Sequence, residues 1–274
     1  MTEAHDWTGR VGGTWAAEWR RTDRSFGALA DRLNAAILEV APETGRALDI
    51  GCGAGATSLA LAAARPHLSV TGADLSPDLL AAARGRAAGL ANLDFVEGDV
   101  LRTGAAIAPV DLMVSRHGVM FFADPVSAFA ALHAAAAPGA PLVFTCFRDP
   151  SQNLWASELV VAVTGAPPAP RKGAPGPFAF ADRDRVARIL AAAGWTDASA
   201  EPVDYANRAG EGADPIADAV AFFARIGPAA PLLRELPPPA REAALARIAA
   251  VCERHRTGDA VDFPAAAWLW TARA

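Results

Sequence analysis

The stretch RALDIGCGAGATSLALA, residues 46–62, decides the fold. Its short apolar run, residues 47–50, ends directly at three alternating glycines, Gly51, Gly53 and Gly55, and helix-forming residues follow. Glycines let the backbone approach a ligand closely, and the first turn of a helix presents free N–H groups to that ligand. The stretch therefore predicts a strand, a ligand-binding loop and a helix in immediate succession.

Patterns typical of strands and helices alternate from this stretch to residue 147. Two helix candidates open with the N-caps Ser76 and Asp124, each followed by proline at the first helical position. The strand candidates are residues 47–50, 68–74, 93–99, 110–115 and 141–147, and the helix candidates include residues 76–89 and 123–139. Such alternation predicts a parallel sheet with helices on both faces.

The alternation breaks after residue 147. Residues 165–177 are rich in Pro and Gly and predict an irregular loop, and a helix capped by Asp182 and ended by Gly194 follows. The remaining candidates are a strand at 197–206, helical stretches at 215–227 and 238–255, and a final strand at 265–274. Segments 149–180 and 205–262 are too long for ordinary connections, so they predict a helical cap on the sheet.

Composition narrows the class of protein. The 274 residues are 52% hydrophobic, enough for a full-sized core, and the formal charge of −5 argues against a nucleic-acid groove. The three cysteines, Cys52, Cys146 and Cys252, have no CxxC spacing and predict reduced thiols of a cytoplasmic protein. We expect no signal peptide, no membrane span and no metal site; Cys252 and His255 alone do not make one.

The glycine loop fits two cofactors. It satisfies the dinucleotide pattern GxGxxG/A, with Asp74 standing 19 residues after Gly55, and it equally satisfies the loop that binds S-adenosylmethionine. Three features favour the second cofactor. Asp49 lies inside the strand two residues before Gly51, Asp99 ends the third strand, and more than forty residues precede the first strand.

The motifs LDIGCGAG, GADLSPDLLAAAR, VEGD and DLMVSRHGVMFFADPVSAFAALHAAAAPGAPLVF occur in this order. Together they resemble the class I S-adenosylmethionine-dependent methyltransferases, small-molecule branch, of the ubiquinone/menaquinone-biosynthesis type. The resemblance covers residues 43–148 most clearly. It departs at His117, where an aromatic residue is frequent, and at Ala140 and Pro141, where glycine and a basic residue are common.

The resemblance implies one α/β domain over residues 1–274: a doubly wound, mostly parallel seven-stranded sheet, Rossmann-like, with an antiparallel last strand and a helical cap. Within it we expect a cofactor-binding core at 43–148, cap insertions at 149–180 and 205–262, and the rest of the core at 181–204 and 263–274. The resemblance also implies that a helical segment at 1–42 lies over the cofactor, S-adenosyl-L-methionine.

The predicted cofactor-binding residues lie at the carboxyl ends of the first four strands and on the N-terminal segment. They are Trp15, Asp49, Gly51, Cys52, Gly53, Gly55, Asp74, Leu75, Asp99, Val100, Ser115 and Arg116. We expect the glycines to cradle the ligand, Asp74 to bind ribose hydroxyls, and Asp99 with Val100 to contact adenine.

Several of these residues have a second interpretation. Asp49 either orients the methionyl ammonium group through water or only caps the loop, and Asp99 is otherwise a plain turn carboxylate. The backbone of Ser115 and Arg116 faces the methionyl part, unless Arg116 only forms a surface ion pair. Trp15 contacts the cofactor or only packs.

His117 is the predicted catalytic residue. It follows the fourth strand, where this fold presents side chains to the transferred methyl group, and an imidazole titrates near neutrality. We expect it to act as a general base, or to align the acceptor by a hydrogen bond, or only to fill the place of an aromatic side chain.

The predicted reaction is methyl transfer to a small, partly hydrophobic metabolite, with oxygen as the preferred acceptor atom. The apolar cap candidates that favour such an acceptor are Trp155, Phe178, Phe180, Phe222 and Phe223. Two alternatives remain: an NAD(P)-dependent oxidoreductase, and a catalytically silent methyltransferase-like binding protein.

Overall fold

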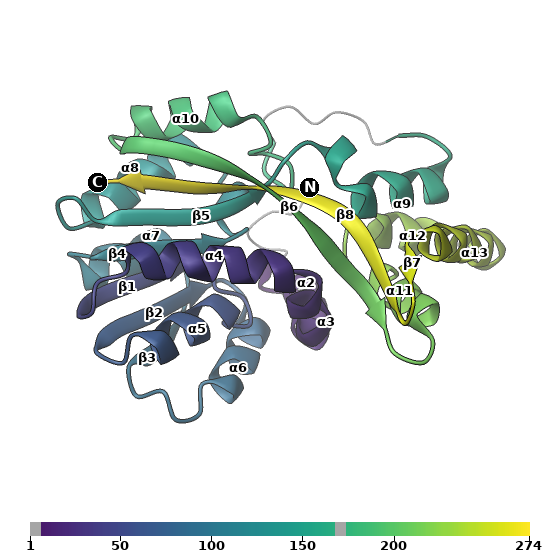
Figure 1. Cartoon of the computed structure of the whole chain (residues 1–274), viewed down its shortest axis with the longest axis horizontal. Helices are drawn as coiled ribbons and strands as arrows, with labels where there is room; N and C mark the ends of the chain where they lie inside the picture. Colours follow the sequence, from purple (N-terminus) through teal and green to yellow (C-terminus); the bar gives the residue numbers. More distant parts are fainter. Residues whose placement is uncertain (1–6, 168–173) are drawn as a thin grey trace.

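A mixed sheet of eight strands forms the centre of the protein (Figure 1). The computed structural model describes residues 7–167 and 174–274. The strands, in sheet order β3-β2-β1-β4-β5-β8-β6 with β7 beside β8, are β1 Gly45–Ile50, β2 Leu68–Asp74, β3 Leu93–Glu97, β4 Leu112–Arg116, β5 Pro141–Phe147, β6 Thr196–Glu211, β7 Arg256–Thr257 and β8 Ala260–Arg273. Strands β1 to β5 pair in parallel, and β8 runs antiparallel to its neighbours. The predicted fold class is confirmed; the two-residue strand β7 is an addition that the sequence analysis did not predict.

Helices cover both faces of this sheet. In chain order they are α2 Arg10–Ala17, α3 Trp19–Ser25, α4 Gly27–Val40, α5 Ala56–Ala64, α6 Pro77–Arg86, α7 Val100–Ile107, α8 Pro125–Ala135, α9 Leu154–Thr164, α10 Arg183–Ala192, α11 Pro215–Phe223, α12 Ala229–Glu235 and α13 Pro238–Arg254, with single 3-10 turns η1 Val119–Phe121 and η2 Pro150–Gln152. Helix α4 packs beside α5, and α7, α8 and α10 pack in a row (Figure 1). The sequence analysis did not predict α7 and α12.

The predicted helix starts are confirmed by their side-chain caps. Ser76 Oγ accepts a hydrogen bond from Leu79 N at 3.3 Å, and Asp124 Oδ1 accepts one from Ser127 N at 3.1 Å. Asp182 caps α10 in the same way. Each cap satisfies a backbone donor that the first helical turn leaves free.

The last two long strands carry the cap. Strands β6 and β8 pair from Thr196 to Glu211, far beyond the edge of β5, and α9, α11, α12 and α13 gather around their distal end (Figure 1). Strand β6 therefore runs five residues past the predicted end at Ala206, and β8 starts five residues before Ala265. Cap and sheet consequently share two continuous strands.

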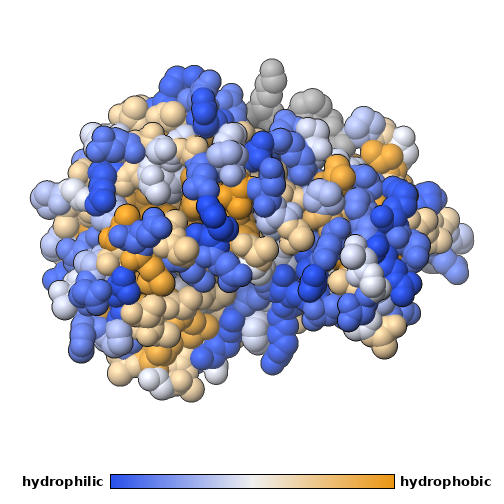
Figure 2. All heavy atoms as spheres, in the orientation of Figure 1, coloured by the Kyte–Doolittle hydropathy of each residue, from blue (hydrophilic) through white to orange (hydrophobic). Residues whose placement is uncertain are grey.

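On the face shown in Figure 2, hydrophilic residues predominate at the cap end, and hydrophobic residues are interspersed at the opposite end. Among the described large hydrophobic residues, only Val126 and Val161 are exposed. Within residues 7–167 and 174–274, no helix has both the length and the hydropathy needed to cross a membrane.

Candidate active site

The glycine loop connects β1 to α5 and lies at the edge of a large cavity. Gly51, Gly53 and Gly55 have φ of 65°, 55° and 82°, the left-handed region that disfavours other residues. A Cβ on Gly53 would meet nothing within 4 Å, whereas one on Gly55 would lie 2.8 Å from Phe95 Cζ. Gly53 thus opens the loop toward the cavity, and Gly55 permits close packing beneath it.

Asp74 fastens this loop to the end of β2. Its Oδ2 accepts a hydrogen bond from Gly53 N at 2.9 Å, and its Oδ1 accepts one from Ser76 N at 2.9 Å. Burial raises the pKa of the Asp74 carboxyl, and these backbone donors oppose that shift. The carboxylate therefore fixes the loop and still presents unused lone pairs to the cavity.

Asp49 is the most deeply buried carboxylate on this wall, at 1% exposure. Ser58 Oγ donates to its Oδ2 at 2.6 Å, and Oδ1 has no hydrogen-bond partner in the described structure. Burial raises the pKa of Asp49 to about 6, and Ser58 and then Arg116 act in the opposite direction. An acidic oxygen without a partner, beside a ligand loop, suits a cationic group of a ligand.

Ser115 and Arg116 end β4 next to β1. Ser115 Oγ donates to Ile50 O at 2.7 Å and accepts from Gly118 N at 3.1 Å, so this side chain joins two strand ends and does not line the cavity. The Arg116 guanidinium lines the cavity and donates to Asp23 Oδ1 at 2.7 Å.

The N-terminal helices are tied to both the core and the cap by ion pairs. Asp23 on α3 binds Arg116 at 2.7 Å and Arg86 at 2.8 Å. Glu18, only 6% exposed, binds Arg225 at 2.9 Å, immediately after α11. Segment α2–α3 consequently bridges the sheet and the cap along the cavity, and Trp15 lines the cavity from it.

Asp99 has a smaller role in the described contacts. It is exposed, and its Oδ1 caps α7 by accepting from Leu101 N at 2.9 Å. Leu75 and Val100 line the cavity nearby. Cys52 also lines it, but its thiol is buried and burial raises its pKa, so the group is a neutral thiol.

All of the predicted cofactor residues except Gly55 and Ser115 line one cavity of about 2760 Å³. That volume exceeds the roughly 300–1,000 Å³ of an ordinary small-ligand pocket. A cavity of this volume has room for two small ligands.

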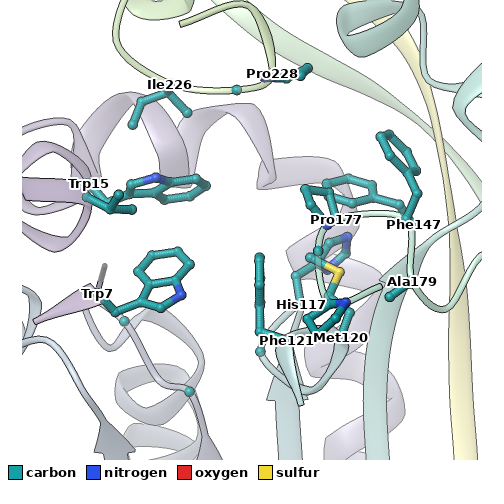
Figure 3. A pocket seen from close by; sticks show the side chains of 18 of the residues that line it. Trp7, Trp15, His117, Met120, Phe121, Phe147, Pro177, Ala179, Ile226 and Pro228 are labelled. Carbon is teal, nitrogen blue, oxygen red and sulfur yellow. The ribbon is translucent and has the colours of Figure 1, made fainter. Parts of the chain in front are cut away.

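Aromatic side chains form much of the cavity wall (Figure 3). Trp7 and Trp15 lie on one side, with Trp7 5.3 Å from the Phe121 ring, and Phe147 lies on the other side. Of the apolar cap candidates, Trp155, Phe178, Phe222 and Phe223 line the cavity. Phe180 does not; it packs in the core against Phe129 at 6.1 Å.

Other lining residues escaped the sequence analysis. Trp7 comes from a segment without a recognisable motif, Met120 and Phe121 lie inside the motif that starts at Asp111 but were not singled out, and Asn207 lies on a strand that was predicted to end at Ala206. The inward alternation of Val203, Tyr205 and Asn207 was the only available signal.

His117 lines the cavity beside Phe147 (Figure 3). Its backbone has φ of 63°, its Nδ1 lies 2.7 Å from Thr145 Oγ1, and its Nε2 has no partner among the described residues. The ring meets Phe147 edge-on, with centroids 4.1 Å apart.

The expectation that His117 titrates near neutrality was wrong. Burial, and then the charge of Arg116, lower its pKa to about 3. The imidazole is therefore neutral at physiological pH and is too weak a base to accept a proton readily. Its remaining capacity is one hydrogen bond at Nε2. Within the described residues, no three His, Cys, Asp or Glu side chains are grouped to hold a metal ion.

Comparison with known proteins decides between the two cofactors. A family model described as a methyltransferase domain matches residues 47–139, the part that holds the glycine loop, Asp74 and Asp99. Residues 47–139 form a methyltransferase domain.

Two relatives of this methyltransferase domain are named for different reactions. Trans-aconitate 2-methyltransferase of Streptomyces avermitilis is 33% identical over 49% of this chain and 52% of its own length. Demethylmenaquinone methyltransferase of Deinococcus radiodurans is 28% identical over 60% of this chain and 73% of its own. The chain thus spans about half of the first relative.

The solved structures support the fold. The cyclopropane synthase MmaA2 of Mycobacterium tuberculosis superposes with a TM-score of 0.51 at 18% identity, covering 88% of this chain and 83% of that one. At this identity the likeness concerns the methyltransferase fold alone.

The cofactor of this class of domain is S-adenosylmethionine, and the site residues fit it. The loop opens at Gly53, Asp74 offers lone pairs for hydroxyl groups, and Asp49 has an unpartnered oxygen for an ammonium group. Between the two cofactors that the glycine pattern allowed, a dinucleotide and S-adenosylmethionine, these observations favour S-adenosylmethionine.

Proposed function

We propose that this protein transfers a methyl group from S-adenosylmethionine to a small, partly hydrophobic acceptor, with oxygen as the preferred acceptor atom. One observation carries the proposal: the glycine loop and the aromatic wall line the same cavity, which is large enough for both molecules. The two relatives name acceptors of different chemistry, trans-aconitate and demethylmenaquinone, so the cavity wall is the better guide.

When bound, S-adenosylmethionine supplies an electrophilic methyl carbon on a sulfonium. The chain must then hold the acceptor in line and exclude water. Asp49 and Asp74 at the ends of β1 and β2 suit the methionyl and ribose ends, and Asp99 with Val100 suits the adenine. Helices α2 and α3, which carry Trp15 and Asp23, line this side of the cavity.

His117 has the role of an aligning group in this proposal. Its neutral imidazole lies at the end of β4, beside the loop that follows β1, with Nε2 unpartnered. A hydrogen bond from Nε2 to the acceptor would orient it, and proximity would supply the rest of the rate.

The function is tested by measuring S-adenosylhomocysteine formed from a library of hydroxylated, amino and carbon acceptors. We expect turnover with hydroxylated apolar compounds. Binding of S-adenosylmethionine without product from any acceptor would instead favour a silent binding protein, and binding of NADH alone would contradict the proposal. The buried free thiols of Cys52, Cys146 and Cys252 suit a reducing compartment such as the cytoplasm.

A further inference from the structure

The cavity is also lined by buried polar groups that no described part of the protein satisfies. Thr22, His117 and Asn207 are 7%, 7% and 4% exposed, and all three line the cavity. Thr22 Oγ1, His117 Nε2 and Asn207 Oδ1 have no hydrogen-bond partner in the described structure. Buried polar atoms normally have partners, because an unsatisfied one costs free energy.

We propose that Asn207, together with Thr22 and His117, binds the polar group of an uncharged aromatic acceptor, such as a phenol. The inference rests on the proposed function, because it assigns the acceptor to the same cavity as the cofactor.

Asn207 is placed on the acceptor side by the long β6–β8 ribbon. It pairs across the ribbon with Phe263, whose ring lies 5.4 Å from that of the cavity residue Phe223. Directly paired residues of antiparallel strands project from the same face. Asn207 therefore belongs to the cap side of the cavity, far along the chain from the glycine loop.

The amide oxygen of Asn207 has no hydrogen-bond partner among the described residues. Burial raises the pKa of Tyr205, and the neighbouring Asn207 side chain opposes this shift, so the two side chains lie close together. Their atoms nevertheless do not reach hydrogen-bond geometry, since the Tyr205 hydroxyl is also unpartnered. An amide offers both donors and an acceptor, which match a hydroxyl group.

Aromatic rings surround His117, one of these polar groups. Phe147 contacts His117 at 4.1 Å, Trp155 at 5.1 Å and Phe178 at 5.7 Å, and Phe26 contacts His117 at 5.1 Å. Figure 3 shows Phe147 and His117 together on one side of the cavity. Stacked and edge-on contacts with such rings favour a flat aromatic ligand.

The charged groups near this wall are already paired. Arg116 binds Asp23, and Arg24 binds Asp218 at 2.7 Å. His117 is neutral because burial lowers its pKa. Three cavity-lining cations have no ion pair among the described residues: Arg10 on α2, Arg185 on α10, which donates to the Ala179 carbonyl, and Arg234 on α12. A polar, uncharged wall favours a neutral hydroxyl over a carboxylate.

The test compares three probes of one shape: naphthalene, 2-naphthol and 2-naphthoate. Each is titrated calorimetrically into the protein saturated with S-adenosylhomocysteine. We expect 2-naphthol to bind about tenfold more tightly than naphthalene, since one satisfied hydrogen bond has roughly that effect. 2-Naphthoate should bind more weakly than 2-naphthol.

Asn207→Leu should remove most of the preference for 2-naphthol and leave the affinity for S-adenosylhomocysteine unchanged. Thr22→Val should reduce the preference severalfold. Because Asn207 Oδ1 has no partner, Asn207→Leu should keep or raise the melting temperature of the ligand-free protein.

Asn153→Leu is the matched control. Asn153 is also buried, but its side chain makes five hydrogen bonds, including one from Ala266 N at 3.1 Å, so this variant should melt at a lower temperature. An equal loss of melting temperature in Asn207→Leu would show a structural role and overturn the inference.

The outcomes separate the inference from the proposed function. If S-adenosylhomocysteine binds but 2-naphthol shows no advantage, or 2-naphthoate binds most tightly, the inference is wrong and the proposed function stands. If S-adenosylhomocysteine does not bind, the proposed function fails, and the inference fails with it.

Discussion

The cofactor wall and the acceptor wall of the cavity are built in opposite ways. On the cofactor wall, Asp74 accepts hydrogen bonds from the backbone of Gly53, in the loop after β1, and of Ser76, in the loop after β2. On the acceptor wall, Thr22, His117 and Asn207 come from three distant segments and keep unpartnered atoms. Backbone groups therefore shape the first wall and leave Asp49 Oδ1 for a ligand, whereas the second wall leaves one unpartnered atom on each of three segments.

The largest effect is expected from a substitution on the cofactor wall. Asp74→Ala removes the acceptor of two backbone hydrogen bonds and the carboxylate offered to the cofactor. We expect the affinity for S-adenosylmethionine to fall roughly 10- to 100-fold, because hydrogen bonds to charged groups contribute about 1.5–3 kcal/mol. Calorimetry measures the loss. Asp99→Ala, which removes only an exposed helix cap, should weaken binding much less; equal losses would contradict the assigned roles.

Two glycine variants separate packing from ligand approach. Gly55→Ala should lower the free energy of unfolding by about 2–4 kcal/mol, since its Cβ would overlap Phe95 in a left-handed backbone. A Cβ at position 53 would meet open space, so Gly53→Ala should lower the free energy of unfolding by only about 1–2 kcal/mol. It should nevertheless weaken cofactor binding more than Gly55→Ala does. Urea unfolding and calorimetry on both variants check this, and a Gly53→Ala protein with unchanged cofactor affinity would refute it.

The pH dependence of cofactor binding tests Asp49. Its pKa of about 6 means that the carboxyl is mostly protonated at pH 5 and mostly ionised at pH 7. An ammonium group prefers the ionised form, so affinity should rise about tenfold from pH 5 to pH 7. Asp49→Asn should bind weakly with a flat profile. A tenfold rise that persists in Asp49→Asn would assign the titration to another group.

His117 should produce the smallest effects, and only on the acceptor side. With its pKa lowered to about 3, it should cause no step near pH 6.5 in the kcat profile. His117→Asn retains a residue that tolerates positive φ, and should reduce kcat/KM by about tenfold or less with cofactor affinity unchanged. A kinetic step near pH 6.5 that disappears in this variant would restore the role of general base.

The sequence predicted the elements whose signals are local. Ser76, Asp124 and Asp182 cap helices where they were expected, because a cap needs only donors two or three residues away. It missed α7, although Asp99 caps that helix too. It also ended β6 early, because the pairing partner Phe263 lies more than fifty residues further along the chain.

The sequence by itself determined the glycine loop, the acidic residues at the strand ends and the class of domain. Positive φ favours glycine, and a parallel strand followed by a helix fixes which side chains reach its end, whatever the rest of the chain does. Only the tertiary structure decided that His117 is buried and neutral, that Phe180 lies in the core, and that Asn207 faces the cavity. Burial and the absence of a partner arise from contacts among residues distant in the chain, and no local pattern records those contacts.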